Sequence, residues 1–168
     1  MITTVGRCAA LETILGKPIT SQFGSIREVS QIYCDLHGIT IAELGTTPLP
    51  DIIAYVREFF TAIGTPDPNR EAFPHACKPL TIPLLIRIED SVGRPLFDSA
   101  FGFEFISTQL ICIEHGYGLQ ASDMARIRDM PYPDYLADVW MPLYQQIHAA
   151  LLPPPEVSSP EDLPEKNP

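Results

Sequence analysis

Residues 80–90 read LTIPLLIRIED, and this stretch decides the fold class that the sequence predicts. Side chains of a β-strand point alternately to its two faces, so an apolar residue at every second position indicates one buried face. Proline lacks the N–H group that a central strand requires, so Pro83 places this strand at a sheet edge. The apolar positions on the predicted buried face are Leu80, Ile82, Leu84, Ile86 and Ile88.

Residues 90–115 extend this strand into a predicted sheet. DSVGRP at 90–95 is rich in turn residues, and the phenylalanines between 97 and 105 then repeat the alternation. A second turn at 107–109 leads into LICIEH at 110–115. The three runs together predict a three-stranded antiparallel β-meander, whose strands at 96–115 pair in a register that the sequence leaves open.

Capping signals predict helices before the sheet. Ser25 and Glu28 form a capping box, apolar residues follow at three- and four-residue spacing, and Gly38 supplies a stop. Similar signals predict a short helix at about 7–15 and a core helix at 50–63.

Helices are also predicted after the sheet, at 122–129 and at 134–152. Pro142 lies inside the last of these, so we expect a kink or a break there. The predicted fold class is therefore α+β, with N-terminal helices, a three-stranded meander, and C-terminal helices packed on one face of the sheet.

Residues 1–152 are predicted to form one globular α+β domain, because a chain of 168 residues fits a single core. PPPEVSSPEDLPEKNP at 153–168 is acidic, rich in proline and poor in apolar groups, so it is predicted to be a disordered tail. Residues 64–79 contain four prolines and no apolar periodicity. This stretch is predicted to be a long loop, either a binding or lid element or a stiff connector.

The composition favours a protein partner over nucleic acid. The formal net charge is −10 and the basic residues are scattered, so phosphate backbones are repelled and a basic protein surface is favoured. The sequence contains no run of about 18 apolar residues, which is the length needed to span a membrane. The first residues do not resemble a secretory signal, so we expect a cytoplasmic protein. The sequence also allows a homo-oligomer.

Cysteines and histidines are the candidate metal ligands. The four cysteines are widely spaced and lack a CxxC pair, which predicts reduced and mostly buried thiols. Cys34 and His37 share a helix at a spacing that permits chelation, and would form a zinc site if His75 and Cys77 approached them. A helical wheel directs Cys34 and His37 outward or sideways, and the combined spacing matches no established zinc pattern. We therefore predict no metal and no other cofactor.

Cys112 and His115 repeat the spacing of Cys34 and His37. They lie on a predicted strand, where three residues of separation place two side chains on opposite faces, so they are excluded as a chelating pair.

An enzyme is the alternative hypothesis. His75 and Cys77 are candidates for the base and nucleophile of a small thiol- or metal-dependent hydrolase. Glu104 and Glu114 are candidates for acid–base work if adjacent strands bring them together. The chain contains no GxSxG, HExxH or phosphate-binding glycine loop, which weighs against this alternative.

SIREVSQIYCDLHGITIAEL at 25–44 resembles the helix, glycine turn, helix pattern of DNA-binding helix-turn-helix units. The resemblance implies a nucleic-acid-binding regulator whose second helix follows Gly38. The positions that match this second helix are Thr40, Ala42, Glu43, Thr46 and Thr47. None of them is the arginine or lysine that would contact phosphates or guanine. A helical hairpin packed on the sheet is the other interpretation.

A non-enzymatic interaction or regulatory protein is the function that these observations favour. PYPDY at 131–135 supplies Tyr132 and Tyr135, which would be exposed anchors for a partner or would fasten the final helix. The long loop and the acidic tail are further candidate contact elements.

Overall fold

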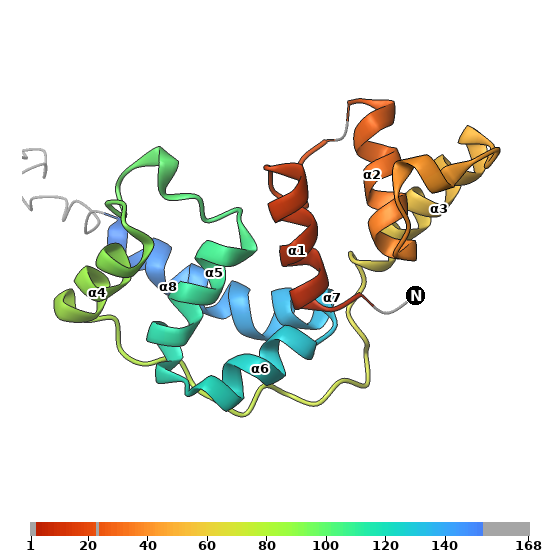
Figure 1. Ribbon diagram of the computed structural model, residues 1–168. Helices are drawn as coiled ribbons and strands as arrows, with labels where there is room; N and C mark the ends of the chain where they lie inside the picture. Colours follow the sequence, from red (N-terminus) through yellow and green to blue (C-terminus); the bar gives the residue numbers. More distant parts are fainter. Residues whose placement is uncertain (1–2, 23, 153–168) are drawn as a thin grey trace, which may run out of the picture.

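The computed structural model describes residues 3–22 and 24–152, in which all regular secondary structure is helical (Figure 1). No β-strand occurs in these ranges, and their only β-type pairing is an isolated antiparallel bridge between Thr4 and Pro131. The predicted α+β fold with a three-stranded meander is therefore wrong. The predicted tail at 153–168 lies outside the described residues.

The elements follow one another along the chain as helices and single turns. The earlier ones are α1 (Val5–Leu15), α2 (Ile26–His37), the 3-10 turn η1 (Ile41–Leu44), α3 (Leu49–Ala62) and α4 (Ile82–Val92). The later ones are the 3-10 turn η2 (Ser99–Phe101), α5 (Ile106–Ile113), the π-helical turn η3 (Glu114–Gly118), α6 (Ala121–Asp129), α7 (Tyr132–Tyr135), the π-helical turn η4 (Leu136–Trp140) and α8 (Met141–Leu151). Among the described residues, no helix combines the length and the apolar character needed to cross a bilayer.

The first predicted strand is the helix α4. Pro83 lies in its first turn, where a missing N–H group costs no hydrogen bond. Gly93 ends the helix in the left-handed conformation, at φ 76. Ile88 is buried, whereas Ile82 and Ile86 are 75% and 49% exposed. Residues 82–88 are apolar at every position except Arg87, so they fit the helical period of 3.6 residues as well as the strand period of two. The predicted alternation assigned Ile82 and Ile86 to the buried face, whereas both face solvent.

The other two predicted strands are also absent. Residues 96–105 form an irregular segment around η2, in which Phe97 is 81% exposed while Phe101 is buried. Residues 106–113 form α5, which buries residues on most of its faces, including Leu110, Cys112 and Ile113. A short helix that is buried on most faces has no polar side to reveal its period, so its sequence cannot be distinguished from that of a buried strand.

The helices predicted outside the sheet are confirmed, within one or two residues for most ends. The capping box is present: the Ser25 hydroxyl accepts from the Glu28 N–H at 3.2 Å, and the Glu28 carboxylate accepts from the Ser25 N–H at 3.3 Å. Gly38 ends α2 with φ 67. Local hydrogen bonds set these ends, which is why they can be read from the sequence.

The kink or break predicted at Pro142 stays a prediction, because the backbone is helical on both sides of this residue, but a π-helical turn lies just before it. η4 ends at Trp140, and α8 begins at Met141 with Pro142 in its first turn. The Tyr117 hydroxyl, from the other π-helical turn, donates to the Val139 carbonyl at 2.7 Å. A side chain from η3 therefore contacts the backbone of η4 where the regular helical ladder changes.

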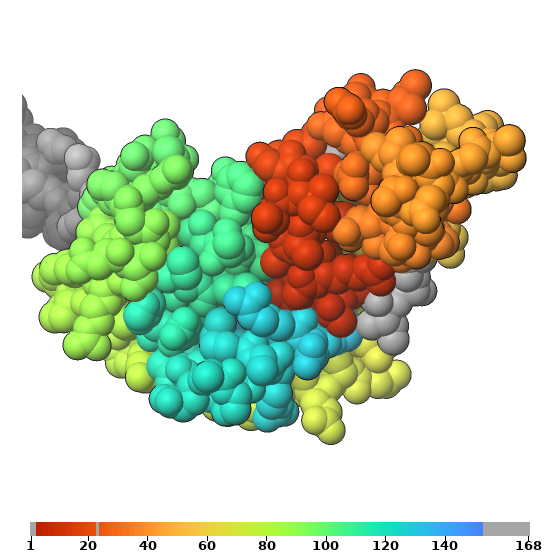
Figure 2. Space-filling model, in the orientation of Figure 1, coloured from red at the N-terminus to blue at the C-terminus, as the bar shows by residue number. Residues whose placement is uncertain are grey.

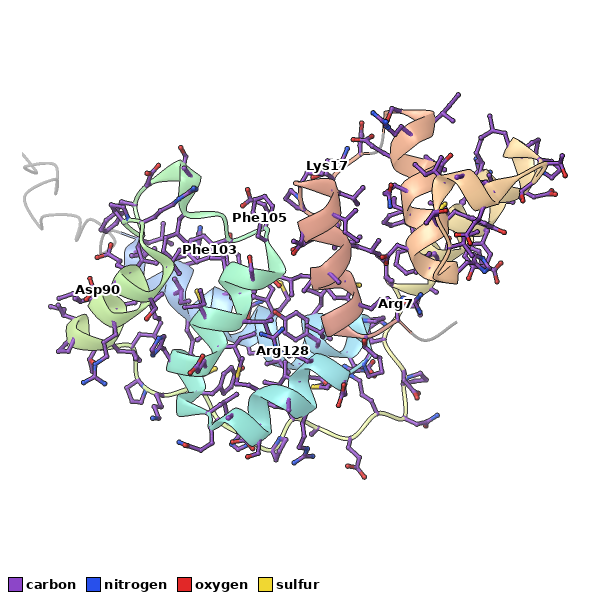
Figure 3. The ribbon with its side chains drawn as sticks, viewed as in Figure 1. Arg7, Lys17, Asp90, Phe103, Phe105 and Arg128 are labelled. Carbon is purple, nitrogen blue, oxygen red and sulfur yellow. The ribbon has the colours of Figure 1, made fainter. Side chains whose placement is uncertain are left out.

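α1 occupies the centre of the molecule, against α5, α6 and α7. α2 and α3 pack together on one side of it, and α4 packs on α5 and η3 on the other (Figure 1). The Arg7 guanidinium of α1, labelled in Figure 3, donates to the carbonyls of Leu36 and Asp35 in the last turn of α2. A cation at a helix C-terminus satisfies carbonyls that have no helical partner, and here it joins two helices.

Residues 63–81, called the strap below, connect α3 to α4 and contain no regular helix or strand. The strap crosses from one side of the molecule to the other and passes beneath α6 in the view of Figure 1. Figure 2 shows part of it, in yellow, beside the blue-green atoms of the C-terminal half. The loop predicted at 64–79 is thus confirmed as a loop that lies along the helices.

Candidate functional site

A cleft with a volume of about 520 Å³ lies between the strap and helices α6 and α7. One wall comes from residues 67–75 of the strap, and the other from residues 123–134. The lining residues are Asp67, Arg70, Glu71, Ala72, Phe73, Pro74, His75, Asp123, Arg126, Ile127, Met130, Pro131 and Asp134. Apolar side chains and charged groups of both signs therefore face one space.

An ion pair with two hydrogen bonds fixes one end of the strap wall. Arg70 Nε lies 2.6 Å from Asp138 Oδ2, and Arg70 Nη2 lies 2.8 Å from Asp138 Oδ1. The backbone N–H of Asp67 donates to Asp134 Oδ1 at 2.8 Å. Hydrogen bonding to Asp138 raises the pKa of the Arg70 guanidinium. The fork of a guanidinium matches the two oxygens of a carboxylate, so this pair fixes orientation as well as distance.

Contacts with α6 and η3 fix the other end of the wall. His75 Nε2 lies 3.5 Å from Asp123 Oδ1, and the Lys78 N–H donates to the Gly116 carbonyl at 2.8 Å. Between these contacts, the Phe73 ring packs edge-on against Tyr117, with 5.2 Å between centroids. The wall is therefore held from both ends by groups on the helical body.

Negative charge predominates around the cleft. Four carboxylates line it, those of Asp67, Glu71, Asp123 and Asp134, together with the two arginines Arg70 and Arg126. Arg70 is already paired with Asp138, which does not line the cleft. Among the described residues, neither Glu71 nor Arg126 has a hydrogen bond or an ion pair. Both groups are thus available to a ligand.

His75 and Cys77, the predicted loop pair, are directed to different partners. His75 lines the cleft next to Asp123, while Cys77 is absent from the lining and contacts Tyr117. Burial, followed by hydrogen bonding with Cys77, raises the pKa of Tyr117. The cleft lining contains no serine, threonine, cysteine or lysine that would act as a nucleophile.

Cys34 and His37 lie on α2, away from the cleft lining. The outward direction predicted for Cys34 is wrong, because the side chain is fully buried; burial, and then the negative charge of Glu43, raise the pKa of its thiol. His37 is exposed and packs against the rings of Tyr33 and Tyr55, with centroid distances of 4.3 and 4.5 Å. No group of three or more potential metal ligands converges anywhere in the described part of the chain.

Cys112 and His115 lie on helical backbone, so the strand argument that separated them was wrong. Cys112 is fully buried in α5, and burial raises the pKa of its thiol to about 12. His115, in η3, has its Nε2 2.8 Å from the Ser91 hydroxyl of α4. One side chain therefore belongs to the core and the other to a contact between helices.

The prediction that adjacent strands align Glu104 and Glu114 for acid–base work is wrong, because the described residues contain no strands. Glu104 precedes α5 and Glu114 begins η3, and both are exposed. Neither lines the cleft.

Tyr132 and Tyr135 are not exposed anchors, and that prediction is corrected. They are 2% and 0% exposed, and the Tyr135 hydroxyl donates to Gln109 Oε1 at 2.9 Å. Both rings face the core because α7 buries every one of its residues. They fasten the C-terminal helices, which was the other interpretation of PYPDY.

The helix-turn-helix resemblance at 25–44 is limited to its first helix. The segment that matches the second helix is η1, a 3-10 turn of four residues, and the next helix begins at Leu49. A single turn is too short to lie in a DNA groove as a recognition helix.

The sequence did not identify the residues that fix the strap to the C-terminal helices. It pointed to His75 and the prolines of 64–79, but not to Arg70, Asp134 or Asp138. The spacing of Asp134 and Asp138 was a local signal, because residues four apart share a helix face. Their partner lies 68 positions away in the sequence, so nothing local identifies it.

No family model, no curated protein and no solved structure matches this chain.

Proposed function

We propose that this chain is a cytoplasmic, non-enzymatic interaction protein that binds a segment of another protein in the cleft between the strap and α6–α7. The observation that carries the proposal is the bidentate Arg70–Asp138 pair, which holds an irregular segment in place as a wall. A wall that is ordered before binding reduces the entropy lost on association. All four cysteines are free thiols, which fits a reducing compartment.

The dimensions and lining of the cleft support a binding role. Its volume of about 520 Å³ falls within the range of roughly 300–1,000 Å³ usual for ligand sites. Phe73, Ile127 and Met130 are apolar residues of the lining, which also contains charged side chains. Apolar contact area supplies affinity, while a few charged groups select the partner. The lining contains no serine, threonine or cysteine to act as the nucleophile of a hydrolase, which favours binding over hydrolysis by these residue types.

Site-specific photo-crosslinking tests this proposal on the full chain. A benzophenone amino acid replaces Ala72, which lines the cleft, or Ala54 on α3, which is also an exposed alanine but lies outside the lining. We expect the label at position 72 to capture one protein from an extract of the source cell, identified by mass spectrometry. The purified partner, added unlabelled, should then suppress that crosslink. Equal capture from both positions, or none from position 72, would refute the proposal.

A further inference from the structure

We propose that the partner segment bound in this cleft carries an arginine or lysine side chain, which enters the cleft and contacts its carboxylates. This inference rests on the proposed function, because it names the chemistry of the segment that the cleft receives. It goes further in choosing a basic segment over an acidic or a purely apolar one.

The balance of charge in the lining is the first argument. The pairing of Arg70 with Asp138 leaves Arg126 as the one arginine of the lining without an ion-pair partner among the described residues. Four carboxylates face the same space. The walls have low polarizability and concentrate the field of these charges, so a cation is attracted and an anion is repelled. The net charge of −10 over the whole chain attracts the same kind of partner from a distance.

The unused hydrogen-bonding capacity of the carboxylates is the second argument. Asp123 accepts from the Gln120 N–H at 3.1 Å and lies beside His75. Asp134 accepts from the Asp67 N–H and lies 4.0 Å from Arg70 Nε, and the Asp67 carboxylate accepts from the Asn69 N–H. Glu71 has no such partner among the described residues. Each carboxylate has about four acceptor positions, so the lining has many more acceptors than donors. A guanidinium with five N–H groups, or an ammonium with three, supplies the missing donors.

The apolar part of the cleft is the third argument. Phe73 presents an aromatic ring, and the attraction between a cation and such a ring adds to the effect of the carboxylates. The long aliphatic stem of arginine or lysine packs against side chains such as Ile127 and Met130 while its charged end reaches the rim. A cleft lined by both apolar and acidic side chains matches a side chain that has an apolar stem and a cationic end.

Peptide selection with charge-matched variants tests the inference. Twelve-residue random peptides displayed on phage are selected against the full chain. The best binders are synthesised with each arginine replaced in turn by citrulline, its neutral isostere, and each lysine by the uncharged norleucine. We expect one such neutral replacement to weaken binding about tenfold or more, as for loss of one partner of a desolvated charge pair. Substitution Glu71→Gln should weaken binding, and Arg126→Gln should strengthen it, because it removes the cation that repels the ligand.

The control variant is Glu58→Gln, which removes an exposed carboxylate of α3 outside the cleft lining and should leave the affinity unchanged. Peptides whose affinity depends on Glu71 or Arg126, but which tolerate every neutral replacement of arginine and lysine or bind more weakly after Arg126→Gln, would overturn the basic-segment inference. They would leave the proposed function intact. If no selected peptide responds to any cleft substitution, the proposed function itself fails.

Discussion

The Glu12 carboxylate accepts a hydrogen bond from the backbone N–H of Ile106 at 2.7 Å, across 94 positions of the chain. Its other oxygen accepts from the Ile19 N–H at 2.9 Å, and the residue is only 4% exposed. A single carboxylate thus joins α1, the segment after it and the start of α5, and each of its oxygens satisfies one buried donor.

Substitution Glu12→Gln should destabilise the protein by about 1–3 kcal/mol, because the amide places an NH₂ group against a backbone N–H and leaves a buried donor without an acceptor. Denaturant unfolding followed by circular dichroism measures the change. Glu58→Gln, on an exposed position of α3, is the matched control and should change stability by at most about 0.5 kcal/mol. Equal effects of the two substitutions would contradict the structural role of Glu12.

The stability of the protein should depend on pH through Glu12. Burial raises the pKa of this carboxyl above its ordinary value of 4.5. Between the ordinary value and the raised one, the folded state binds more protons than the unfolded state, so the free energy of unfolding falls as the pH rises. Unfolding curves measured from pH 4 upward should therefore show the parent losing stability relative to Glu12→Gln across this window. Stability profiles of the parent and of Glu12→Gln that run parallel over this pH range would contradict the predicted role of Glu12.

Loss of the Arg70–Asp138 pair should release the strap. Substitution Arg70→Ala removes both hydrogen bonds, and Arg70→Lys retains the charge but not the fork. We expect a glutamate-specific endoproteinase to cleave the Glu71–Ala72 bond of the strap faster in both variants than in the parent, with the larger increase for alanine. Arg57→Ala, on an exposed position of α3, is the control. Unchanged cleavage rates would show that the strap is held by its other contacts.

Any larger residue at Gly116 should destabilise the protein, because η3 and α8 approach each other closely at this point. A Cβ atom there would lie 2.6 and 2.8 Å from the terminal methyl carbons of Leu143, which is fully buried. Gly116→Ala should cost about 1–3 kcal/mol of stability through overpacking. In combination with Leu143→Ala, the loss should be smaller than the sum of the two single losses, since the second substitution makes room. Gly24→Ala, where a Cβ meets nothing within 4 Å, is the control.

The four cysteines should differ in reactivity according to burial. Burial raises the pKa of the Cys8 and Cys112 thiols to about 12, and both side chains are inaccessible, as is that of Cys34. Cys77 is half-buried. Iodoacetamide at pH 8 should therefore modify Cys77 first and the others only after unfolding, which peptide mass spectrometry measures. Early modification of Cys8 or Cys112 would contradict their place in the core.

Local signals in the sequence were sufficient for much of the helical structure. The capping box of Ser25 and Glu28, and the left-handed stop at Gly38, act within four residues and were read correctly. The fold class was missed at 80–115, where α4 and α5 have apolar residues on more than one face. Thr81 and Gly93 flank α4. These two residues at the helix ends indicate the helix more reliably than the spacing of the apolar residues between them.

The candidate site was predictable only in part. The run of prolines identified 64–79 as a long loop, and His75 in that loop does line the cleft. The groups that hold it, Asp134 and Asp138, lie on the last helices, and only the tertiary fold brings them to Arg70. Tyr132 and Tyr135 were proposed as surface residues because a sequence does not reveal which face of a four-residue helix is covered.

The strap also determines how the chain can be divided. α1 precedes it and packs on α5, α6 and α7, all of which follow it, so the two halves of the polypeptide share one apolar core. A backbone break within the strap would leave that shared core and its tertiary contacts in place. The protein is thus suited to fragment complementation, in which two separately produced halves, joined near Phe73 in the intact chain, reassemble into one fold.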